Sequence, residues 1–389
     1  MMKLEKDKWE RVQLWNVCKK AKKVDIRRQT GSFNYIDIGS IDSNLKRISE
    51  LQRISWNEAS SRARQIVMKN DTLFSTVRVN LERIALVTND IPDAIASTGF
   101  TVIRSNGKVD TIFLFYVCSS PNFIAKVIEL QKGTAYPAVT DKIVFNQEIP
   151  IPPLHEQQQI AELFQNLEEV MGKAEKQNEN LKSLRKTLIK GLLNKEPVFG
   201  NLLSVKNCRP VRFDNIADCI EEHDKQPLDN GITRFIGLEN IEADNFQLQG
   251  FGNIADGTTF TKRFSKGDVL FGKRRAYLKK VAVADFDGVC SGDILVFRAR
   301  EDIMLPELLP YYASSEAFIN HAVNTSAGSL SPRTKWRDLS SFKIAIPEIK
   351  AQEKIVDVFN KLETTIIQLK KQKQTLKTLK QKLLNEILG

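Results

Sequence analysis

Residues 157–193 read QQQIAELFQNLEEVMGKAEKQNENLKSLRKTLIKGLL, and residues 352–388 read QEKIVDVFNKLETTIIQLKKQKQTLKTLKQKLLNEIL. Each stretch follows a short lead-in that contains proline, IPIPPLHEQ at 149–157 and IAIPEIKAQ at 344–352. Apolar residues recur in both stretches at alternating spacings of three and four, which predicts two long helices that pair along a narrow seam. Because the same helix occurs in the middle and at the end of the chain, we expect the segment before it to occur twice as well.

The predicted seam has a polar residue near the middle of each helix. Its positions are Ile160, Leu163, Leu167, Gln177, Leu181 and Leu184 in the first helix and Ile355, Leu362, Leu369, Gln372, Leu376 and Leu379 in the second. A stripe this narrow favours helix-on-helix pairing over packing on a globular domain, which needs a wider apolar face. A buried Gln177–Gln372 pair would fix the register of the two helices at some cost in stability.

A short linker, LNKEPVFGNLL at residues 193–203, indicates the direction of the pairing. It ties the segment that follows to the end of the first helix, and that segment leads directly into the start of the second helix. Both of these helix ends therefore lie near one domain, which predicts an antiparallel pair. A helix of this length spans about 55 Å, so we expect a rod with one globular domain at each end.

The globular segments also repeat, at a shift of about 195 residues. KNDTLFSTVR at 69–78 matches KGDVLFGKRR at 266–275, and Gln157 and Phe164 match Gln352 and Phe359. The pattern predicts a duplicated module related by a pseudo-twofold axis. The expected boundaries are a first globular domain at 1–154, a helix at 155–195, a second domain at 196–349 and a helix at 350–389.

Each module mixes strands and helices without regular alternation, which predicts the α+β class rather than a doubly wound sheet. We expect strands in NYIDIGSID, RFIGLENIE, DTLFSTV and DVLFGK, and a helix at residues 55–68. Residues 112–118 fit either a strand or a buried helix, and residues 318–323 read as the end of a helix.

Composition points to a cytoplasmic protein with a polyanionic partner. The chain of 389 residues is 42% hydrophobic and carries a net charge of +11. The first residues lack the apolar core of a signal peptide, and the densest apolar run, 112–118, is too short to span a membrane. The five cysteines form no CxxC motif, which suits reduced thiols. Residues 262–280 hold eight basic residues and one acid within an otherwise slightly acidic segment, which suggests a directed basic surface over a merely solvated edge.

The motifs of an enzyme are missing. The three histidines, His155, His223 and His321, have no metal-ligand spacing, and no GxxxxGK[ST] phosphate loop occurs. GFGNIA at 250–255 fits the dinucleotide fingerprint G-x-G-x-x-A, but no clear strand precedes it and no helix pattern follows, so it reads as a loop. Pro152-Pro153 lacks the preceding Asn or Asp of an amino-methyltransferase motif. We therefore expect no catalytic residue, no metal and no cofactor in this chain.

The combined pattern resembles the specificity (S) subunit of type I restriction–modification systems over nearly the whole chain. The most specific stretches are PLHEQQQIA at 153–161, KGDVLFGKRRAYLKKVA at 266–282, CSGDILVFRA at 290–299 and SAGSLSPRTKWRDLSSFKIAIP at 326–347. The first half departs from them, with STVRVNLERIA where the second has GKRRAYLKKVA. That difference fits two domains that read different half-sites.

The resemblance implies a division of labour. Each globular unit would be a target recognition domain for one half of a bipartite double-stranded DNA sequence, and the coiled coil would set the unread spacer. Two methyltransferase (M) subunits would dock on the helical regions, and restriction (R) subunits would complete the complex. S-adenosylmethionine, ATP and magnesium would belong to those partners.

The resemblance also directs the choice of DNA-binding candidates. Arg274 or Arg275 could pair bidentately with guanine, and Lys273 and Tyr277 lie beside them. Candidates for phosphate contacts are Lys279, Lys280, Arg333 and Lys335, with hydroxyl contacts from Ser329, Ser331 and Thr334. In the first domain the candidates are Arg62, Arg64 and Arg78, with the basic run Lys19, Lys20, Lys22, Lys23, Arg27 and Arg28.

Two other classes of protein stay open from the sequence. An adenine methyltransferase or a fused restriction enzyme with degenerate motifs would have to bind S-adenosylmethionine. A coiled-coil adaptor whose end domains bind proteins would show no salt-dependent binding to duplex DNA.

Overall fold

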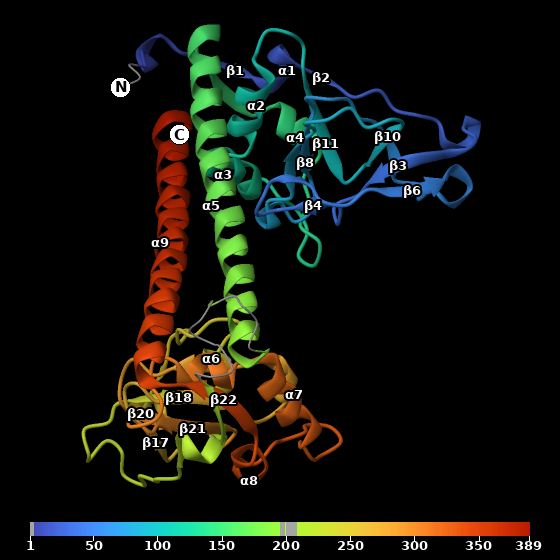
Figure 1. Ribbon diagram of the computed structural model, residues 1–389. Helices are drawn as coiled ribbons and strands as arrows, with labels where there is room; N and C mark the ends of the chain where they lie inside the picture. The colour runs from blue at the N-terminus through green and yellow to red at the C-terminus, as the bar shows by residue number, and fades with distance from the viewer. Residues whose placement is uncertain (1–3, 195–198, 200–207) are drawn as a thin grey trace. The chain divides into compact units, whose positions relative to one another are not determined.

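The computed structural model of the chain describes residues 4–194, 199 and 208–389 (Figure 1). Its tertiary contacts divide it into two compact units, unit 1 from residues 1–174 with 371–389 and unit 2 from residues 175–370. Both units combine helices with mainly antiparallel sheets, which confirms the predicted α+β class. The linker expected at 193–203 lies largely outside the described residues.

The two predicted long helices are present as α5 (Leu154–Asn194) and α9 (Ile349–Leu388). Each helix contributes one half to unit 1 and the other half to unit 2. The boundary between the units therefore falls inside both helices.

A buried glutamine fixes the start of each long helix. The Gln157 side chain accepts from the Asp110 backbone N–H at 2.8 Å and donates to the Pro152 carbonyl at 2.8 Å. Gln352 accepts from the Leu305 N–H at 2.9 Å, and its amide donates to the carbonyls of Ile303 and Pro347. In each copy, the glutamine therefore joins the proline-containing lead-in to the globular segment that precedes it.

Unit 1 is built on two four-stranded sheets, together with a β1–β12 pair. The sheet with strand order β2-β11-β8-β9 is antiparallel throughout, and in the sheet with order β6-β3-β10-β7 only β3 and β10 run parallel. Figure 1 shows α2 and α3 between the first sheet and the unit's half of α5. The strands are β1 (Glu10–Gln13), β2 (Cys18–Lys20), β3 (Ser32–Ile36), β6 (Gln52–Ser55), β7 (Ala63–Ile66), β8 (Thr72–Ser75), β9 (Ile84–Leu86), β10 (Ala94–Ser97), β11 (Phe100–Ser105) and β12 (Glu148–Ile151).

Three helices of unit 1 each begin at a side-chain cap. They are α2 (Thr111–Cys118), α3 (Pro121–Glu129) and α4 (Asp141–Phe145), and their caps are Asp110, Ser120 and Thr140. Each cap oxygen accepts backbone N–H groups that the first helical turn leaves unpaired. The segment 112–118, which the sequence left ambiguous, is therefore a buried helix. A short α1 (Leu14–Val17) and a β4–β5 pair (Ile41–Asp42, Arg47–Ile48) complete the unit.

Unit 2 repeats this plan. Its sheets have the orders β14-β21-β18-β19 and β16-β15-β20-β17, and β13 pairs with β22. The strands are β13 (Cys208–Arg212), β14 (Ala217–Ile220), β15 (Arg234–Ile236), β16 (Gly252–Asn253), β17 (Lys262–Phe264), β18 (Val269–Gly272), β19 (Val281–Val283), β20 (Gly288–Cys290), β21 (Ile294–Ala299) and β22 (Lys343–Pro347). The helices are α6 (Leu309–Ala313), α7 (Glu316–Asn324) and α8 (Trp336–Ser340).

The same ion pair occurs in both units. It joins the residue before β8 to β11 in unit 1, and the residue before β18 to β21 in unit 2. Asp71 pairs with Arg104 at 2.6 Å in unit 1, and Asp268 pairs with Arg298 at 2.8 Å in unit 2. Both carboxylates are almost fully buried, and each also accepts a backbone N–H of its own turn. Such a carboxylate needs its guanidinium partner, because a buried unpaired charge costs several kcal/mol.

The helix predicted at residues 55–68 is wrong. The structure has the end of β6, a 3-10 turn at Trp56–Glu58 and strand β7 there. Along β7 buried Ala63 and Gln65 alternate with exposed Arg64, which is the period of a strand and not of a helix. Gln65 donates to the carbonyls of Ser97 and Phe100, so it is a satisfied buried polar group.

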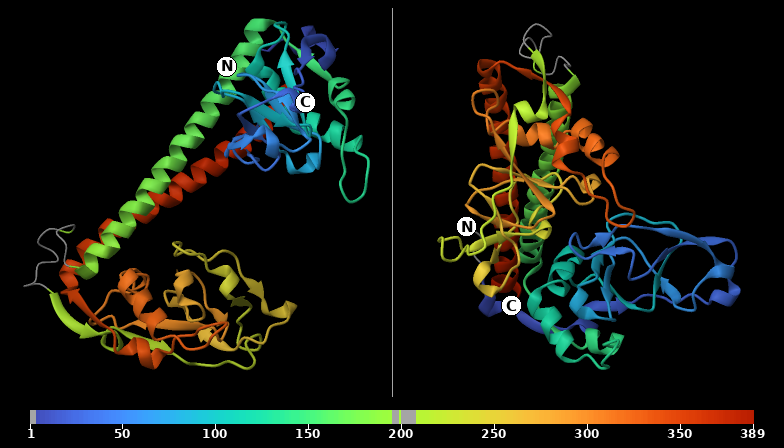
Figure 2. Two further views of the ribbon diagram at one scale, coloured as in Figure 1. Left: turned by 90° about the vertical axis from the view of Figure 1, so that its right-hand side faces the viewer. Right: turned by 90° about the horizontal axis from the view of Figure 1, so that it is seen from below.

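The helix pairing is antiparallel within each unit. In unit 1, Ile160 and Phe164 near the start of α5 join one core with Leu384 and Ile387 near the end of α9. In unit 2, Leu188 and Leu192 near the end of α5 join the core of the early α9 residues Ile355, Phe359 and Leu362. Figures 1 and 2 show the two half-helices side by side in each unit.

The predicted seam is buried near the starts of the two helices, at Ile160, Ile355 and Leu362, but not in its middle. Gln177 and Gln372 are exposed, and so are Leu184 and Leu379, at 47% and 42%. Further buried residues lie next to predicted positions, at Phe164, Asn178, Arg185, Phe359, Ile366 and Ile387, and Lys380 is half-buried. The buried face therefore includes long polar side chains, whose stems can cover apolar surface while their charged ends form pairs.

No single helix among the described residues is long and apolar enough to cross a membrane. One bent pair, α2 with α3, meets the length and composition requirement with a 55° angle between its helices.

Candidate nucleic-acid interface

Each unit presents the same turn between two antiparallel strands. In unit 1 it joins β8 to β9 and contains a 3-10 helix at Val79–Leu81, and in unit 2 it joins β18 to β19 and contains one at Ala276–Leu278. We call these turn 1 (residues 76–83) and turn 2 (residues 273–280). They hold all of the basic candidates in the KNDTLFSTVR and KGDVLFGKRRAYLKK stretches.

Both turns use left-handed backbone at positions without glycine. Arg78 and Glu82 both have φ of 49° in turn 1, and Arg275 and Lys279 have φ of 54° and 52° in turn 2. This conformation costs a non-glycine residue on the order of 1 kcal/mol, so the surrounding contacts must hold it. The same geometry in both units indicates that the turn's shape is a built feature of the fold.

A second loop supports each turn. The Arg78 N–H donates to the Pro137 carbonyl at 2.8 Å, and the Arg275 N–H donates to the Pro332 carbonyl at 2.7 Å. Next to these bonds, Val77 bridges to Ala138 and Arg274 bridges to Arg333. The backbone scaffold is therefore the same in both units, whereas the side chains on it differ.

Turn 2 carries a cluster of charges around one carboxylate. Arg333 donates to Asp293 through Nε at 2.7 Å and Nη2 at 3.2 Å, and Arg274 donates to it through Nη1 at 3.2 Å. The hydrogen bonds from Arg333, with the charges of Arg333, Arg274 and Lys273, hold the pKa of Asp293 below its usual range despite partial burial. The two arginine side chains stay 43% and 47% exposed.

The other exposed side chains of this surface suit a nucleic acid. Arg275 donates to the carbonyl of Leu330, which is itself 88% exposed. Tyr277 is 52% exposed, and Ser329 and Lys335 are also exposed. Cations, an aromatic ring and a hydroxyl on one pair of loops are the groups that contact phosphates and bases.

Two candidates from the sequence are corrected by their contacts. Lys280 is half-buried, and its ammonium group donates to the Leu238 carbonyl at 2.5 Å, so it is not a free phosphate ligand. Thr334 is fully buried, with its hydroxyl 3.2 Å from that of Thr325. Lys262, the first residue of the basic stretch, is also buried and pairs with Glu221 at 2.9 Å. Sequence alone could not reveal that these groups turn inward.

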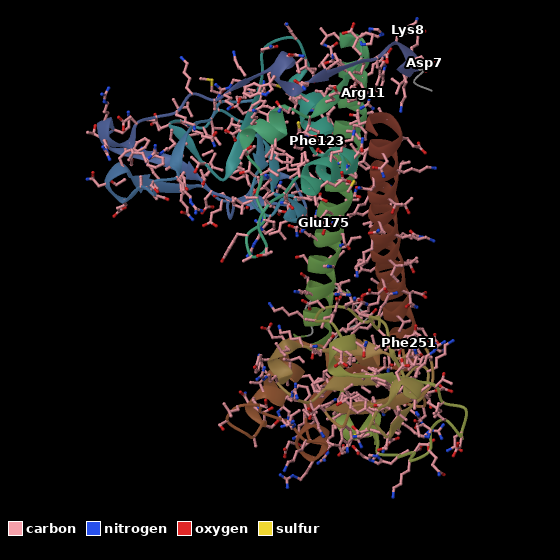
Figure 3. The ribbon with its side chains drawn as sticks, turned by 180° about the vertical axis from the view of Figure 1, so that it is seen from behind. Asp7, Lys8, Arg11, Phe123, Glu175 and Phe251 are labelled. Atoms are coloured by element: carbon pink, nitrogen blue, oxygen red, sulfur yellow. The ribbon has the colours of Figure 1, made fainter. Side chains whose placement is uncertain are left out.

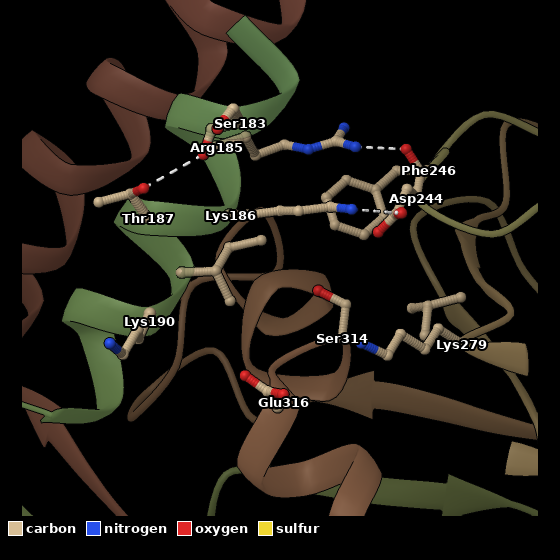
Figure 4. A pocket seen from close by; sticks show the side chains of 12 residues that line it. Ser183, Arg185, Lys186, Thr187, Lys190, Asp244, Phe246, Lys279, Ser314 and Glu316 are labelled. Atoms are coloured by element: carbon tan, nitrogen blue, oxygen red, sulfur yellow. Dashed lines mark hydrogen bonds and ion pairs between the residues drawn. The ribbon is translucent and has the colours of Figure 1, made fainter. Parts of the chain in front are cut away.

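Lys279 faces a different part of unit 2. It lines a cavity of about 260 Å³ beside the C-terminal half of α5, together with Arg185, Lys186, Asp244, Ser314 and Glu316 (Figure 4). Lys186 pairs with Asp244 at 2.8 Å across this cavity.

In unit 1 the exposed arginine of turn 1 lies on an aromatic ring. The guanidinium of Arg78 is 4.7 Å from the ring centre of Tyr136, which is 70% exposed. Only its place between Gly133 and Pro137 could have marked Tyr136 in the sequence. Arg62 lies just before β7 and Arg64 lies on it, and both are exposed. The basic side chains between Lys19 and Arg28 are exposed as well.

A further cationic and aromatic cluster of unit 2 was missed. Arg234 stacks on Phe251 at 4.5 Å and on Phe286 at 5.1 Å. Phe251 is 45% exposed and is labelled in Figure 3. Phe251 and Phe286 lie 17 and 52 residues after Arg234 in the sequence, so spacing could not link them to it.

The described residues contain no group of His, Cys, Asp and Glu side chains that could hold a metal ion. GFGNIA at 250–255 contains β16 and a 3-10 turn at Ile254–Asp256, with no α-helix to receive a pyrophosphate. A side chain at Gly252 would collide with the Phe235 ring, so this glycine serves packing.

Comparison with known proteins agrees with the duplicated fold. The family described as "Type I restriction modification DNA specificity domain" matches residues 6–183 and again 225–378. The chain belongs to this family. Because the two matches fall on the two halves of the duplication, the specificity domain occurs twice in this chain.

Several specificity-family proteins are similar to the chain. The EcoDI type I restriction enzyme specificity subunit of Escherichia coli is 27% identical over 279 residues, or 64% of this chain. That match spans only 62% of the EcoDI subunit. The MjaVIII specificity subunit of Methanocaldococcus jannaschii is 24% identical over 83% of this chain and 79% of its own length. A solved chain from a study of complex assembly and conformational transition of the type I restriction–modification system is 25% identical, covers 99% of this chain and 98% of its own length, and has a TM-score of 0.65.

Proposed function

We propose that this chain is the DNA-recognition subunit of a type I restriction–modification complex, with each unit reading one half of a bipartite duplex target. The observation that carries the proposal is the repeated specificity domain, which presents one backbone scaffold twice with different exposed side chains. A duplicated reader with two different surfaces suits a target with two different half-sites. The paired helices α5 and α9 would set the unread spacer between them.

The catalytic steps would belong to partner subunits in the cytoplasm. Two methyltransferase subunits would dock on the helices and supply S-adenosylmethionine, and restriction subunits would supply ATP-driven cleavage with magnesium. The outer faces of the helices support docking, because they expose the apolar residues Val170, Leu184, Val358, Ile367 and Leu379. Exposed apolar groups along one element often mark a protein interface.

Methylation mapping tests this proposal. The full chain is produced in cells with its neighbouring methyltransferase, and methylated adenines are mapped across the genome. We expect one bipartite motif whose two halves are separated by a fixed unread spacer. Uniform or undetectable methylation in cells that contain the assembled complex would contradict the proposal.

Binding measurements distinguish the reader from an enzyme or an adaptor. Together with the methyltransferase, the chain should bind duplex DNA with an affinity that falls steeply as salt rises. The isolated chain should not bind S-adenosylmethionine. Tight binding of S-adenosylmethionine by the isolated chain would favour the methyltransferase alternative.

A further inference from the structure

The charged cluster of unit 2 has no counterpart in unit 1, although the backbone around it does. The Lys273 N–H donates to the Asp293 carbonyl at 2.9 Å, as the Thr76 N–H donates to the Gly99 carbonyl at 2.8 Å. The bridge between Arg274 and Arg333 likewise matches that between Val77 and Ala138. Unit 1 therefore has valine, glycine and alanine where unit 2 has Arg274, Asp293 and Arg333.

The two arginines share Asp293 unequally. Arg333 takes the carboxylate in the bidentate mode, through Nε and Nη2, and donates its Nη1 to the Ser331 carbonyl at 3.4 Å. Arg274 uses only Nη1. Had Arg333 been absent, the bidentate mode would have been open to Arg274, since a carboxylate prefers two parallel N–H donors.

Because Arg274 contacts Asp293 through Nη1 alone, its Nε–H and Nη2–H groups remain available to a ligand. Its Nε and Nη2 have no hydrogen-bond partner among the described residues, and its side chain is 43% exposed. Nε–H and Nη2–H form two nearly parallel donors. The major-groove edge of guanine offers two matching acceptors, N7 and O6, and no other base offers both.

We propose that Asp293 and Arg333 hold Arg274 as a guanine-reading residue, and that this cluster makes the preference of unit 2 differ from that of unit 1. This inference rests on the proposed function. Asp293 is a positioning residue that acts through Arg274, because its own oxygens are occupied by guanidinium donors. The half-site of unit 2 therefore contains a guanine at one position, while Val77 excludes the same contact at the equivalent place in unit 1.

A phosphate contact is the competing role for Arg274. A guanidinium that binds only phosphate adds affinity for every sequence and no base preference. The fixed orientation argues for base reading, because a phosphate contact does not need an arginine held by a second arginine and a shared carboxylate. The two roles predict different results in a selection experiment.

The test uses the full chain assembled with its methyltransferase, and selects binders from a library of random DNA duplexes. Arg274→Ala should lose the preference for guanine at one position of one half-site by about five- to 150-fold, the range for a bidentate contact. Asp293→Asn should weaken the preference at the same position. In the Arg274→Ala background Asp293→Asn should change base preference no further, because both act through one side chain.

Two further variants control for folding and for general charge. Asp293→Glu keeps the carboxylate and should retain part of the preference. Lys335→Ala removes an exposed cation of the supporting loop and should weaken all sequences alike. Melting curves of each complex establish that the variants are folded.

Different outcomes overturn different conclusions. If Arg274→Ala lowers affinity for all duplexes equally, or changes both half-sites, the guanine assignment is wrong. If Asp293→Asn still shifts base preference when Arg274 is already alanine, Asp293 does not act through Arg274. If the wild-type complex selects no bipartite sequence at all, the proposed function fails instead.

Discussion

Arg185 on α5 donates to the carboxylate of Glu363 on α9 at 3.0 Å, within unit 2. In unit 1 the ion pair of Lys380 on α9 with Glu168 on α5 holds the equivalent place, about 195 residues away in each partner. The two helices therefore have opposite roles in the two units. The helix α5 supplies the cation in unit 2 and the carboxylate in unit 1, and α9 does the reverse. An antiparallel pair of copied helices produces this relationship.

Both ion pairs lie next to an aromatic pair, which is stacked in unit 2 and tilted in unit 1. Tyr311 stacks on Phe359 with ring centres 3.8 Å apart in unit 2, and Tyr116 lies 4.9 Å from Phe164 in unit 1. Tyr116 also donates to Glu168 at 3.0 Å. The aromatic rings bind each half-helix to its own globular part, while the ion pair binds it to the other helix.

Replacement of Arg185 should destabilise unit 2. Its side chain is only 4% exposed, and in Arg185→Ala the carboxylate of Glu363, 22% exposed, loses its partner. We expect a loss of about 2–3 kcal/mol, less than for a fully buried pair because Glu363 still contacts water. Thermal unfolding of the full chain measures the effect.

The matched control is Lys173→Ala, which breaks an exposed pair with Glu169 and should cost well under about 1 kcal/mol. Equal effects of the two variants would contradict this role of Arg185.

The corrected seam predicts opposite behaviour for two neighbouring residues. Asn178 is 6% exposed, and its Oδ1 has no partner among the described residues, whereas Gln177 is exposed. Asn178→Leu should raise the unfolding midpoint by the equivalent of about 1–3 kcal/mol, because it removes a buried unsatisfied group. Gln177→Leu should change stability by less than about 0.5 kcal/mol. A larger effect at Gln177 would restore the seam predicted from sequence.

Much of the fold could be predicted from sequence because the duplication repeats it. Gln157 and Gln352 recur at the helix starts, and their repetition marked the helices before their hydrogen bonds were known. The exposure of Gln177 beside buried Asn178 could not be predicted in this way, because both side chains are polar amides, and Arg185 looks like a surface residue in sequence. The role of Asp293 depends on residues 19 and 40 positions away, which only the sheet brings together.

The two turns should act on different half-sites. In the assembled complex, Arg275→Ala should weaken or relax one half-site by about 1–3 kcal/mol. Arg78→Ala should affect the other half-site, since Arg78 occupies the equivalent left-handed position of turn 1. Competition binding against duplexes altered in one half at a time separates the two effects. Equal losses in both halves from either variant would argue against one reader per unit.

The buried thiols should resist alkylation in the native chain. Burial raises the pKa of Cys18 and of Cys290 to about 12, so almost no thiolate is present near pH 8. We expect iodoacetamide to modify these two residues slowly without denaturant and fully in its presence, as mass spectrometry of the peptides can measure. Rapid native modification of Cys290 would show that its β20 environment opens to solvent.

The depressed pKa of Asp293 makes the stability of unit 2 depend on pH in a defined direction. A carboxyl group whose pKa is lower in the folded chain than in the unfolded chain stabilises the fold above its unfolded pKa, and this contribution is lost as the pH falls through the folded pKa. The unfolding midpoint of the wild type should therefore exceed that of Asp293→Asn by its largest amount at neutral pH. This difference should become smaller only at acidic pH, below the ordinary aspartate pKa of about 4. Asp285→Asn is the control, because Asp285 is an exposed carboxyl group of the same unit without a guanidinium partner among the described residues, and its replacement should change the unfolding midpoint at neutral pH much less than Asp293→Asn does. If the difference in unfolding midpoint between the wild type and Asp293→Asn stayed constant down to acidic pH, the stabilising effect of Asp293 would not come from its charge.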